Sequence, residues 1–228
     1  QKGFIGGEFK LGIIPTIMPT LLPMFLNNFI KKYPKIKLKI EELTTEEIMT
    51  RINDGHLDAA IAATPLESDN IKERPLYYEP FVAYVPNNHR LRELKTLEVS
   101  DLDIEDMLLL EDGHCFREGV INLCKTYKAH EEDHFQLESG SIETLIKLSN
   151  EGMGMTLLPY LHTLDINEGF STNLKHFKEP SPAREVSLIY HKSELKMQII
   201  DALHNVISGV IRGAITFSNV EIISPLAK

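Results

Sequence analysis

The sequence from Phe9 to Phe29, FKLGIIPTIMPTLLPMFLNNF, pairs an apolar strand with an amphipathic helix. The run from Phe9 to Ile14 is almost wholly apolar and predicts a buried strand. Beyond it, apolar residues recur at helical spacing, at Ile17, Leu21, Met24, Phe25 and Phe29. This pattern predicts a helix that is bent or restarted near Pro23, because proline removes a helical hydrogen bond. A strand followed by a helix is the repeating unit of α/β folds.

The strand-to-helix order continues along the chain. Further strands are predicted over 36–40, 57–63, 81–85, 135–137, 155–158 and 186–190. Further helices are predicted over 46–53, 115–127, 142–148 and 199–214. The alternation indicates a mainly parallel α/β architecture, in which Pro86 marks a crossing into a second lobe.

Composition excludes several classes of protein. The chain has 228 residues, of which 43% are hydrophobic and 25% charged, as in ordinary globular proteins. No apolar run approaches the ~18 residues that would span a bilayer. A net charge of −9 opposes nonspecific binding to nucleic-acid phosphates. Two cysteines are too few for a secreted scaffold held by disulfides.

Those two cysteines lie nine residues apart in EDGHCFREGVINLC, from Glu111 to Cys124. In the predicted helix, nine residues place the sulfurs on opposite faces and about 13 Å apart along the axis. A disulfide tolerates a Cα separation of only about 7 Å. Cys115 and Cys124 could therefore bond only if the helix unravelled, which favours a redox switch; two structural thiols remain the alternative.

Cys115 has the surroundings of a reactive thiol. It stands at the predicted helix start, where unpaired N–H groups stabilise an anion, and His114 and Arg117 add donors or positive charge. Gly113 allows the loop to turn into the helix. Cys124 is expected in the middle of the helix, on its buried stripe, where a thiol is desolvated and inert until exposed.

The segment DGHCFR at 112–117, with its second cysteine at 124, resembles the sensing segment of peroxide-sensing LysR-type transcription regulators. Further matching stretches are GIIPT at 12–16, LP at 22–23, GHLD at 55–58, SIETL at 141–145 and GMTLLP at 154–159. The resemblance spans nearly the whole chain and implies a type 2 periplasmic-binding-protein-like effector domain with two Rossmann-like lobes. Residues 8–85 and 185–228 would form lobe I, 86–184 lobe II with both cysteines, and 1–7 the remnant of a linker.

The resemblance also implies roles for individual residues. Peroxide would oxidise Cys115 to a sulfenic acid, and Cys124 would then form a disulfide with it. The residues implied around the reacting sulfur or in the ligand cleft are His114, Arg117, Thr16, Thr45, Arg184 and Ser141. Simpler roles stay open for several of them: a cap or turn for each threonine, a helix N-cap for Ser141, and a solvated surface position for Arg184.

The partners implied are hydrogen peroxide, a second copy of the chain in a homodimer or tetramer, and a reductant of the glutaredoxin or thioredoxin type. DNA would be bound only through a winged helix-turn-helix domain that precedes this segment, and RNA polymerase is a candidate partner. The resemblance implies a cytoplasmic protein without membrane contact, cofactor or metal. Phe116 and Glu118 depart from it, because these regulators commonly have leucine and aspartate there, and the connector from Cys124 to Ser141 is longer.

A second motif, HEEDH at 130–134, matches the H-E-x-x-H pattern of zinc hydrolases. That pattern requires a helix, whereas this stretch has three consecutive acids and precedes a predicted strand, which indicates a solvated connector. Zinc ligation by Cys115 and Cys124 is also disfavoured, since their spacing is far from that of structural zinc sites. We expect no metal site.

Two other classes of function remain open. Two α/β lobes suit a small-molecule binder, so the chain could be an ordinary effector-binding domain or a solute-binding protein with structural cysteines. A thiol peroxidase would use the same first chemical step. We expect no enzyme, because a helix that must unravel in every cycle is poorly suited to turnover.

Overall fold

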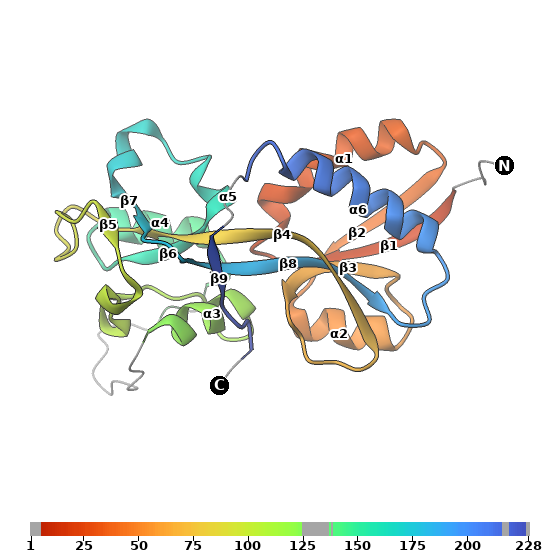
Figure 1. Cartoon of the computed structure of the whole chain (residues 1–228), viewed down its shortest axis with the longest axis horizontal. Helices are drawn as coiled ribbons and strands as arrows, with labels where there is room; N and C mark the ends of the chain where they lie inside the picture. The colour runs from red at the N-terminus through yellow and green to blue at the C-terminus, as the bar shows by residue number, and fades with distance from the viewer. Residues whose placement is uncertain (1–5, 125–136, 138, 216–218, 227–228) are drawn as a thin grey trace. The chain divides into compact units, whose positions relative to one another are not determined.

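The structure is a computed structural model that describes residues 6–124, 137, 139–215 and 219–226 (Figure 1). The chain forms two compact units: Gln1–Tyr77 with Glu185–Thr216, and Tyr78–Arg184 with Phe217–Lys228. Two long strands, β4 (Ile71–Tyr84) and β8 (Ser181–His191), each run from one unit into the other.

The structure differs from the expected bounds at three places. Residues 78–85, expected in the first lobe, belong to unit 2, because Phe81–Tyr84 of β4 pair with a strand of that unit. The segment after residue 216 also belongs to unit 2, where β9 (Val220–Ile222) pairs with Ser181–Ala183 of β8. Gly7, expected in the linker, is the first residue of β1.

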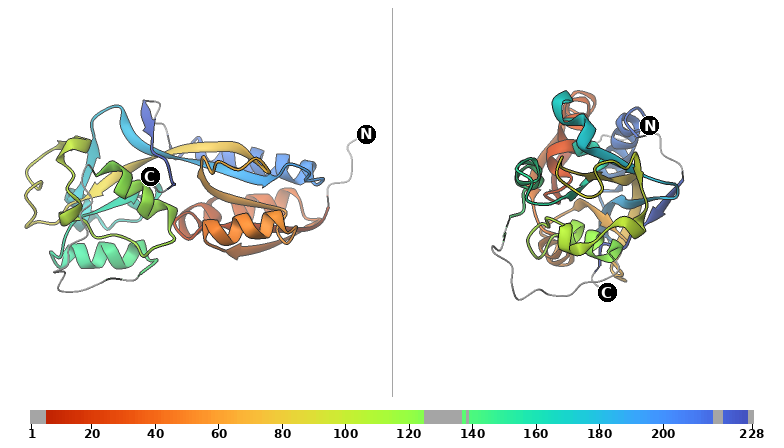
Figure 2. Two further views of the ribbon diagram at one scale, coloured as in Figure 1. Left: turned by 90° about the horizontal axis from the view of Figure 1, so that it is seen from below. Right: turned by 90° about the vertical axis from the view of Figure 1, so that its left-hand side faces the viewer.

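Unit 1 is built on a sheet with helices on both faces. Its other elements are β1 (Gly7–Ile13), α1 (Met18–Lys32), β2 (Ile36–Glu42), α2 (Thr45–Asn53), β3 (Ala59–Thr64) and α6 (Met197–Ile211). β1 pairs in parallel with β2 and β3, and β3 pairs antiparallel with β8. Figure 1 shows α1 and α6 on one face and α2 on the other; α2 faces the viewer in the left view of Figure 2. Every residue of β3 is buried, as two covered faces require.

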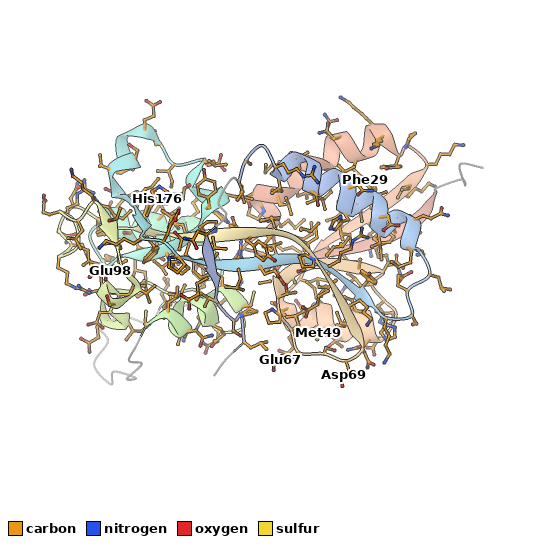
Figure 3. The ribbon with its side chains drawn as sticks, viewed as in Figure 1. Phe29, Met49, Glu67, Asp69, Glu98 and His176 are labelled. Atoms are coloured by element: carbon orange, nitrogen blue, oxygen red, sulfur yellow. The ribbon has the colours of Figure 1, made fainter. Side chains whose placement is uncertain are left out.

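Helix α1 shows how the opening sequence folds. It is one helix from Met18 to Lys32 with Pro23 inside it, so the helix does not restart there, and the alternative of a bend at Pro23 stays a prediction. The apolar stripe holds the helix in place, because Leu21, Phe25 and Phe29 are all buried. Phe29, labelled in Figure 3, lies where α1 packs beside α6.

Unit 2 contains the cysteine segment. Its further elements are β5 (Thr96–Leu97), α3 (Cys115–Leu123), α4 (Ile142–Asn150), β6 (Thr156–Pro159), α5 (Tyr160–Thr163) and β7 (Leu174–Phe177), with short 3₁₀ turns at Val99–Asp101, Ile104–Asp106 and Glu168–Asn173. β4 pairs antiparallel with β6 and β7, while β5–β7 and β8–β9 are parallel. The sheet is therefore mixed, and not mainly parallel as predicted.

The core of unit 2 gathers on the apolar side of α3. Phe116, Val120 and Leu123 of this helix are buried in one cluster with Phe81 and Leu157 of the neighbouring strands. The HEEDH stretch and the strand predicted at 135–137 fall outside the described residues, apart from Leu137, which is in no strand. Within the described ranges, no helix is long and apolar enough to cross a membrane.

Candidate functional site at the cysteine helix

The helix that carries the cysteines begins where the sequence predicts. Gly113 has a φ of +90°, a left-handed conformation that glycine adopts at little cost, and so turns the loop into the helix. His114 is the N-cap residue and Cys115 the first residue of α3. In the described part of the chain, the His114 side chain makes no capping hydrogen bond. Cys115 thus lies at the N-terminal, positive end of the helix dipole, a setting that favours a thiolate.

His114 is held in a tight polar pocket. It is buried, and its Nε2 lies 3.4 Å from Oε1 of Glu111. The backbone of Gly140 approaches the same ring so closely that a Cβ there would lie 2.7 Å from Nε2. Glycine at position 140 thus leaves the room that the imidazole occupies next to Cys115.

Arg117 lies in the first turn of the helix and forms an ion pair with Asp112, which precedes the helix. Its Nε donates to Oδ1 of Asp112 at 2.7 Å, and the arginine side chain is only 15% exposed while the aspartate is 91% exposed. The ion pair ties the loop before Cys115 to the first turn after it. It holds the guanidinium close to the start of the helix.

The two thiols are in contrasting settings. Neither Cys115 nor Cys124 is in a disulfide; Cys115 is partly exposed, and Cys124 is buried. Burial raises the pKa of the Cys124 thiol to about 11, and the negative charge of Asp103 adds to the effect. Cys124 is thus the protonated, protected partner.

Cys124 was expected in the middle of a helix reaching Tyr127, and this position is wrong. The helix ends at Leu123, and Cys124 is its C-cap residue with an extended ψ of 129°. Its N–H still bonds to the carbonyl of Ile121 at 3.1 Å. Nine residues of helix still put about 13 Å between the two positions along the axis, far beyond the reach of a disulfide.

Phe116, the neighbour of Cys115, enters a buried group of side chains that sequence reasoning missed. Its ring meets the edge of Phe81 at a centroid distance of 5.2 Å and an angle of 80°. On the same ring, the Cζ atom of Arg184 lies 5.4 Å from the centroid, a cation–π contact. Nε and Nη2 of Arg184 reach Oε2 of Glu79 at 2.9 and 2.8 Å.

Arg184 is therefore not a solvated surface residue. It is 3% exposed, and its partner Glu79 is fully buried. The other carboxylate oxygen of Glu79 accepts from the backbone N–H of Leu161, in the first turn of α5, at 2.9 Å. Both oxygens are thus hydrogen-bonded, as a buried charge requires.

Ser141 was expected either to cap a helix or to face a ligand, and the structure shows the helix cap. It is the N-cap residue of α4, and its Oγ accepts from the N–H of Thr144 at 3.3 Å. This bond satisfies one of the donors that every helix start leaves open. Whether the serine also faces a ligand stays a prediction.

Thr16 and Thr45 lie in unit 1, whereas the other predicted site residues lie in unit 2. Thr16 is buried in the turn between β1 and α1. At the start of α2 the cap is Thr44, which forms a capping box with Glu47, and Thr45 is the first helical residue. The buried Oγ1 of Thr45 has no hydrogen-bond partner within the described residues. The capping role considered for Thr45 is therefore wrong.

Two further observations concern the alternatives to a thiol switch, which are a small-molecule site and a metal site. An open pocket of about 440 Å³ in unit 1 lies between loop residues 53–58 and 191–196, and the predicted site residues are not among those that line it. Among the described residues, no group of three or more His, Cys, Asp or Glu side chains is arranged to hold a metal ion.

Comparison with known proteins identifies relatives along almost the whole chain. The LysR substrate binding domain matches residues 2–210. The "Hydrogen peroxide-inducible genes activator" of Pectobacterium carotovorum is 33% identical over 190 residues, which are 83% of this chain and 62% of the relative. The chain thus spans about three fifths of the length of such relatives.

Solved structures agree in fold. OxyR from Porphyromonas gingivalis superposes with a TM-score of 0.86 at 24% identity, covering 95% of this chain and 99% of that one. A cysteine-to-serine mutant of Corynebacterium glutamicum OxyR, solved with H₂O₂ bound, has a TM-score of 0.82 at 27% identity, covering 93% and 67%. These matches confirm the expected two-lobed effector-domain fold.

Proposed function

The chain belongs to the LysR substrate-binding domain family, and we propose that it is the regulatory domain of a cytoplasmic transcription regulator that senses hydrogen peroxide. The proposal is supported by relatives that are named as peroxide-inducible activators and by the solved H₂O₂-bound OxyR. The observation that carries it is chemical: a single helix begins at an accessible thiol and ends at a buried one.

In the proposed first step, peroxide oxidises Cys115. The thiolate attacks one oxygen of H₂O₂, an S–O bond forms, and the O–O bond breaks. The departing hydroxide takes up a proton and leaves as water, so sulfur is oxidised to sulfenic acid while peroxide oxygen is reduced. The positive helix end and the nearby side chains of His114 and Arg117 stabilise the negative charge that moves onto this oxygen.

In the second step, Cys124 resolves the sulfenic acid. Its sulfur attacks that of Cys115, an S–S bond forms, the S–OH bond breaks, and the thiol proton leaves with the hydroxyl group as a second water. Two thiols and one peroxide thus give one disulfide and two waters. Because the helix separates the sulfurs, its first turns must unfold, and the disulfide then stabilises the rearranged segment.

Thr16, Thr45 and Arg184 remain proposed contacts of the peroxide. The buried, unpartnered hydroxyl of Thr45 supports its assignment, since a buried polar atom without a partner is costly unless a ligand uses it. Ser141 is the proposed ligand-facing residue of α4. Substitution of Thr45 with valine, which keeps the shape, should slow the oxidation of Cys115 without changing the fold.

The proposed output is transcriptional. Rearrangement of α3 would change how copies of the chain pack in a homodimer or tetramer, and so the spacing of winged helix-turn-helix domains on DNA. RNA polymerase is the proposed downstream partner, and a glutaredoxin or thioredoxin would reduce the disulfide. The proposal involves no cofactor and no multiple turnover.

The test is mass spectrometry of the protein after one equivalent of H₂O₂. We expect the loss of two hydrogen atoms, mapped to Cys115 and Cys124 by proteolysis without reductant. Cys115→Ser should abolish both this product and trapping of a sulfenic acid, whereas Cys124→Ser should let the sulfenic acid persist or oxidise further.

Other outcomes identify the alternatives. Thiols that stay unreacted would overturn the sensor and favour an effector-binding domain with structural cysteines. Sustained consumption of peroxide in the presence of a thiol donor would instead identify a peroxidase.

A further inference from the structure

Phe116 has no part in the chemistry proposed above, yet it is buried and directly follows the reactive cysteine in the chain. Its ring is 3% exposed and contacts the Phe81 ring on β4 and the Arg184 guanidinium on β8. All three residues belong to unit 2. The first turn of α3 is therefore attached to two strands through one side chain.

The cation in this contact cannot easily move away. Glu79 pairs with Arg184 through two nitrogens and is itself fixed to the backbone of α5 at Leu161. If the buried guanidinium of Arg184 lost its contact with Glu79 or with Phe116, its charge would be poorly stabilised, because no water would replace the lost interaction. The ring of Phe116 thus rests on a cation whose position is set by a buried carboxylate.

We propose that Phe81, Phe116, Arg184 and Glu79 form a clasp that holds the first turn of α3 in its reduced conformation and sets the rate of disulfide formation. This inference rests on the proposed function, since it concerns its second step. Glu79 and Phe116 act in it as positioning residues and have no part in the chemical steps.

The clasp acts on one step and not on the other. Oxidation of Cys115 takes place while the start of the helix is folded, so it proceeds with the clasp closed. Disulfide formation requires the Cys115 end to unwind, and Phe116 must then leave both the Phe81 ring and the Arg184 guanidinium. Loss of the clasp should therefore accelerate the second step and leave the first unchanged.

The test compares Phe116→Leu with a matched variant on the same helix, Val120→Ala. Both variants remove buried apolar atoms of α3, but only Phe116→Leu also removes the cation–π contact. Stopped-flow mixing with H₂O₂ gives the rate of disulfide formation, and sulfenic acid trapping in the Cys124→Ser background gives the rate of the first step. We expect Phe116→Leu to speed disulfide formation about tenfold, clearly more than Val120→Ala, and to change the first step less than about twofold.

A second test isolates the contribution of the Arg184 cation by placing Phe116→Leu in a double-variant background. In Glu79→Gln/Arg184→Met the buried ion pair is replaced as a unit, so no charge is left unpaired. There, at H₂O₂ concentrations high enough that the second step limits the rate, the effect of Phe116→Leu on disulfide formation should fall to about threefold or less, because the ring has no cation to lose. A merely apolar role for Phe116 would give the same effect in both backgrounds.

The outcomes separate this inference from the function it rests on. If the unsubstituted chain forms the disulfide but Phe116→Leu forms it no faster, or no faster than Val120→Ala, the clasp is overturned and the sensor stands. An equal acceleration of the first step also overturns the clasp. If the unsubstituted chain forms no disulfide, the proposed function fails and the inference fails with it.

Discussion

The two ends of α3 present the same chemical group in opposite environments. At its start, the Cys115 thiol is partly exposed, and Arg117 lies in the same first turn of the helix. At its end, the Cys124 thiol is buried among apolar side chains, where burial raises its pKa to about 11. The helix dipole adds to the contrast, because its positive end faces one sulfur and its negative end the other.

Under the proposed function, one short helix assigns both roles of the thiol pair. A reactive thiol needs access and a stabilised anion, whereas a resolving thiol must stay inert until the first has reacted. In this proposal the direction of the helix supplies both conditions. The helix also keeps the two sulfurs apart, so the contrast lasts only while the helix is folded.

The largest expected effect is a difference in alkylation. In the reduced, folded protein near neutral pH, iodoacetamide should label Cys115 well before Cys124, as followed by peptide mass spectrometry. A pKa of about 11 instead of 9.0 lowers the thiolate fraction of Cys124 by about 100-fold, and restricted access of the reagent to the buried sulfur slows labelling further. If the two cysteines were labelled at equal rates, or Cys124 faster, the contrast between the two ends of the helix would be contradicted. The control is labelling in denaturant, where both cysteines should react at the same rate.

The next effect concerns the Cys115 end alone. Gly140→Ala places a Cβ 2.7 Å from Nε2 of His114 and 3.1 Å from Oε1 of Glu111, so the imidazole or the loop must move. We expect a loss of about 1–3 kcal/mol in the free energy of unfolding, measured in urea, and a slower oxidation of Cys115. The control is Gly209→Ala in α6, where a Cβ meets nothing within 4 Å. Equal effects of the two substitutions would mean that position 140 does not shape the site.

The smallest expected effect is a fall in the free energy of unfolding at alkaline pH, caused by the Cys124 thiol. Its pKa is raised in the folded state, so the thiol stays protonated there while the unfolded chain ionises. This contribution to stability is fully present below pH 9.0, is lost as the pH rises to about 11, and then levels off. Urea midpoints across this range should fall more steeply for the unsubstituted chain than for Cys124→Ala. Parallel curves would show that Cys124 is not desolvated as described.

Local patterns were enough to predict much of this arrangement. The apolar stripe and Gly113 placed the start of α3 at Cys115, because both signals lie within one turn of the boundary. Helix α2 carries a similar signal. Thr44 followed by Glu47 is a capping box, and reading it would have excluded Thr45 as the cap from sequence alone.

What could not be predicted depends on contacts between distant segments. Glu79 and Arg184 are 105 residues apart, so no local pattern reveals that they form one buried pair. The close approach of Gly140 to His114 is likewise set by how two loops meet. The end of α3 was missed for a related reason: no glycine or proline follows Leu123, and the helix ends there without a local stop signal.

The central claim is that oxidation unfolds the helix between the two thiols, and amide hydrogen exchange across residues 115–124 in the two redox states tests it most directly. The intramolecular disulfide is verified by mass spectrometry in the same samples. We expect the amides of α3 to be protected in the reduced protein and those of its first turns to exchange rapidly in the oxidised protein, with protection restored on reduction. Unchanged protection with the disulfide present would contradict the switch, even if Cys115 proved to be the more reactive thiol.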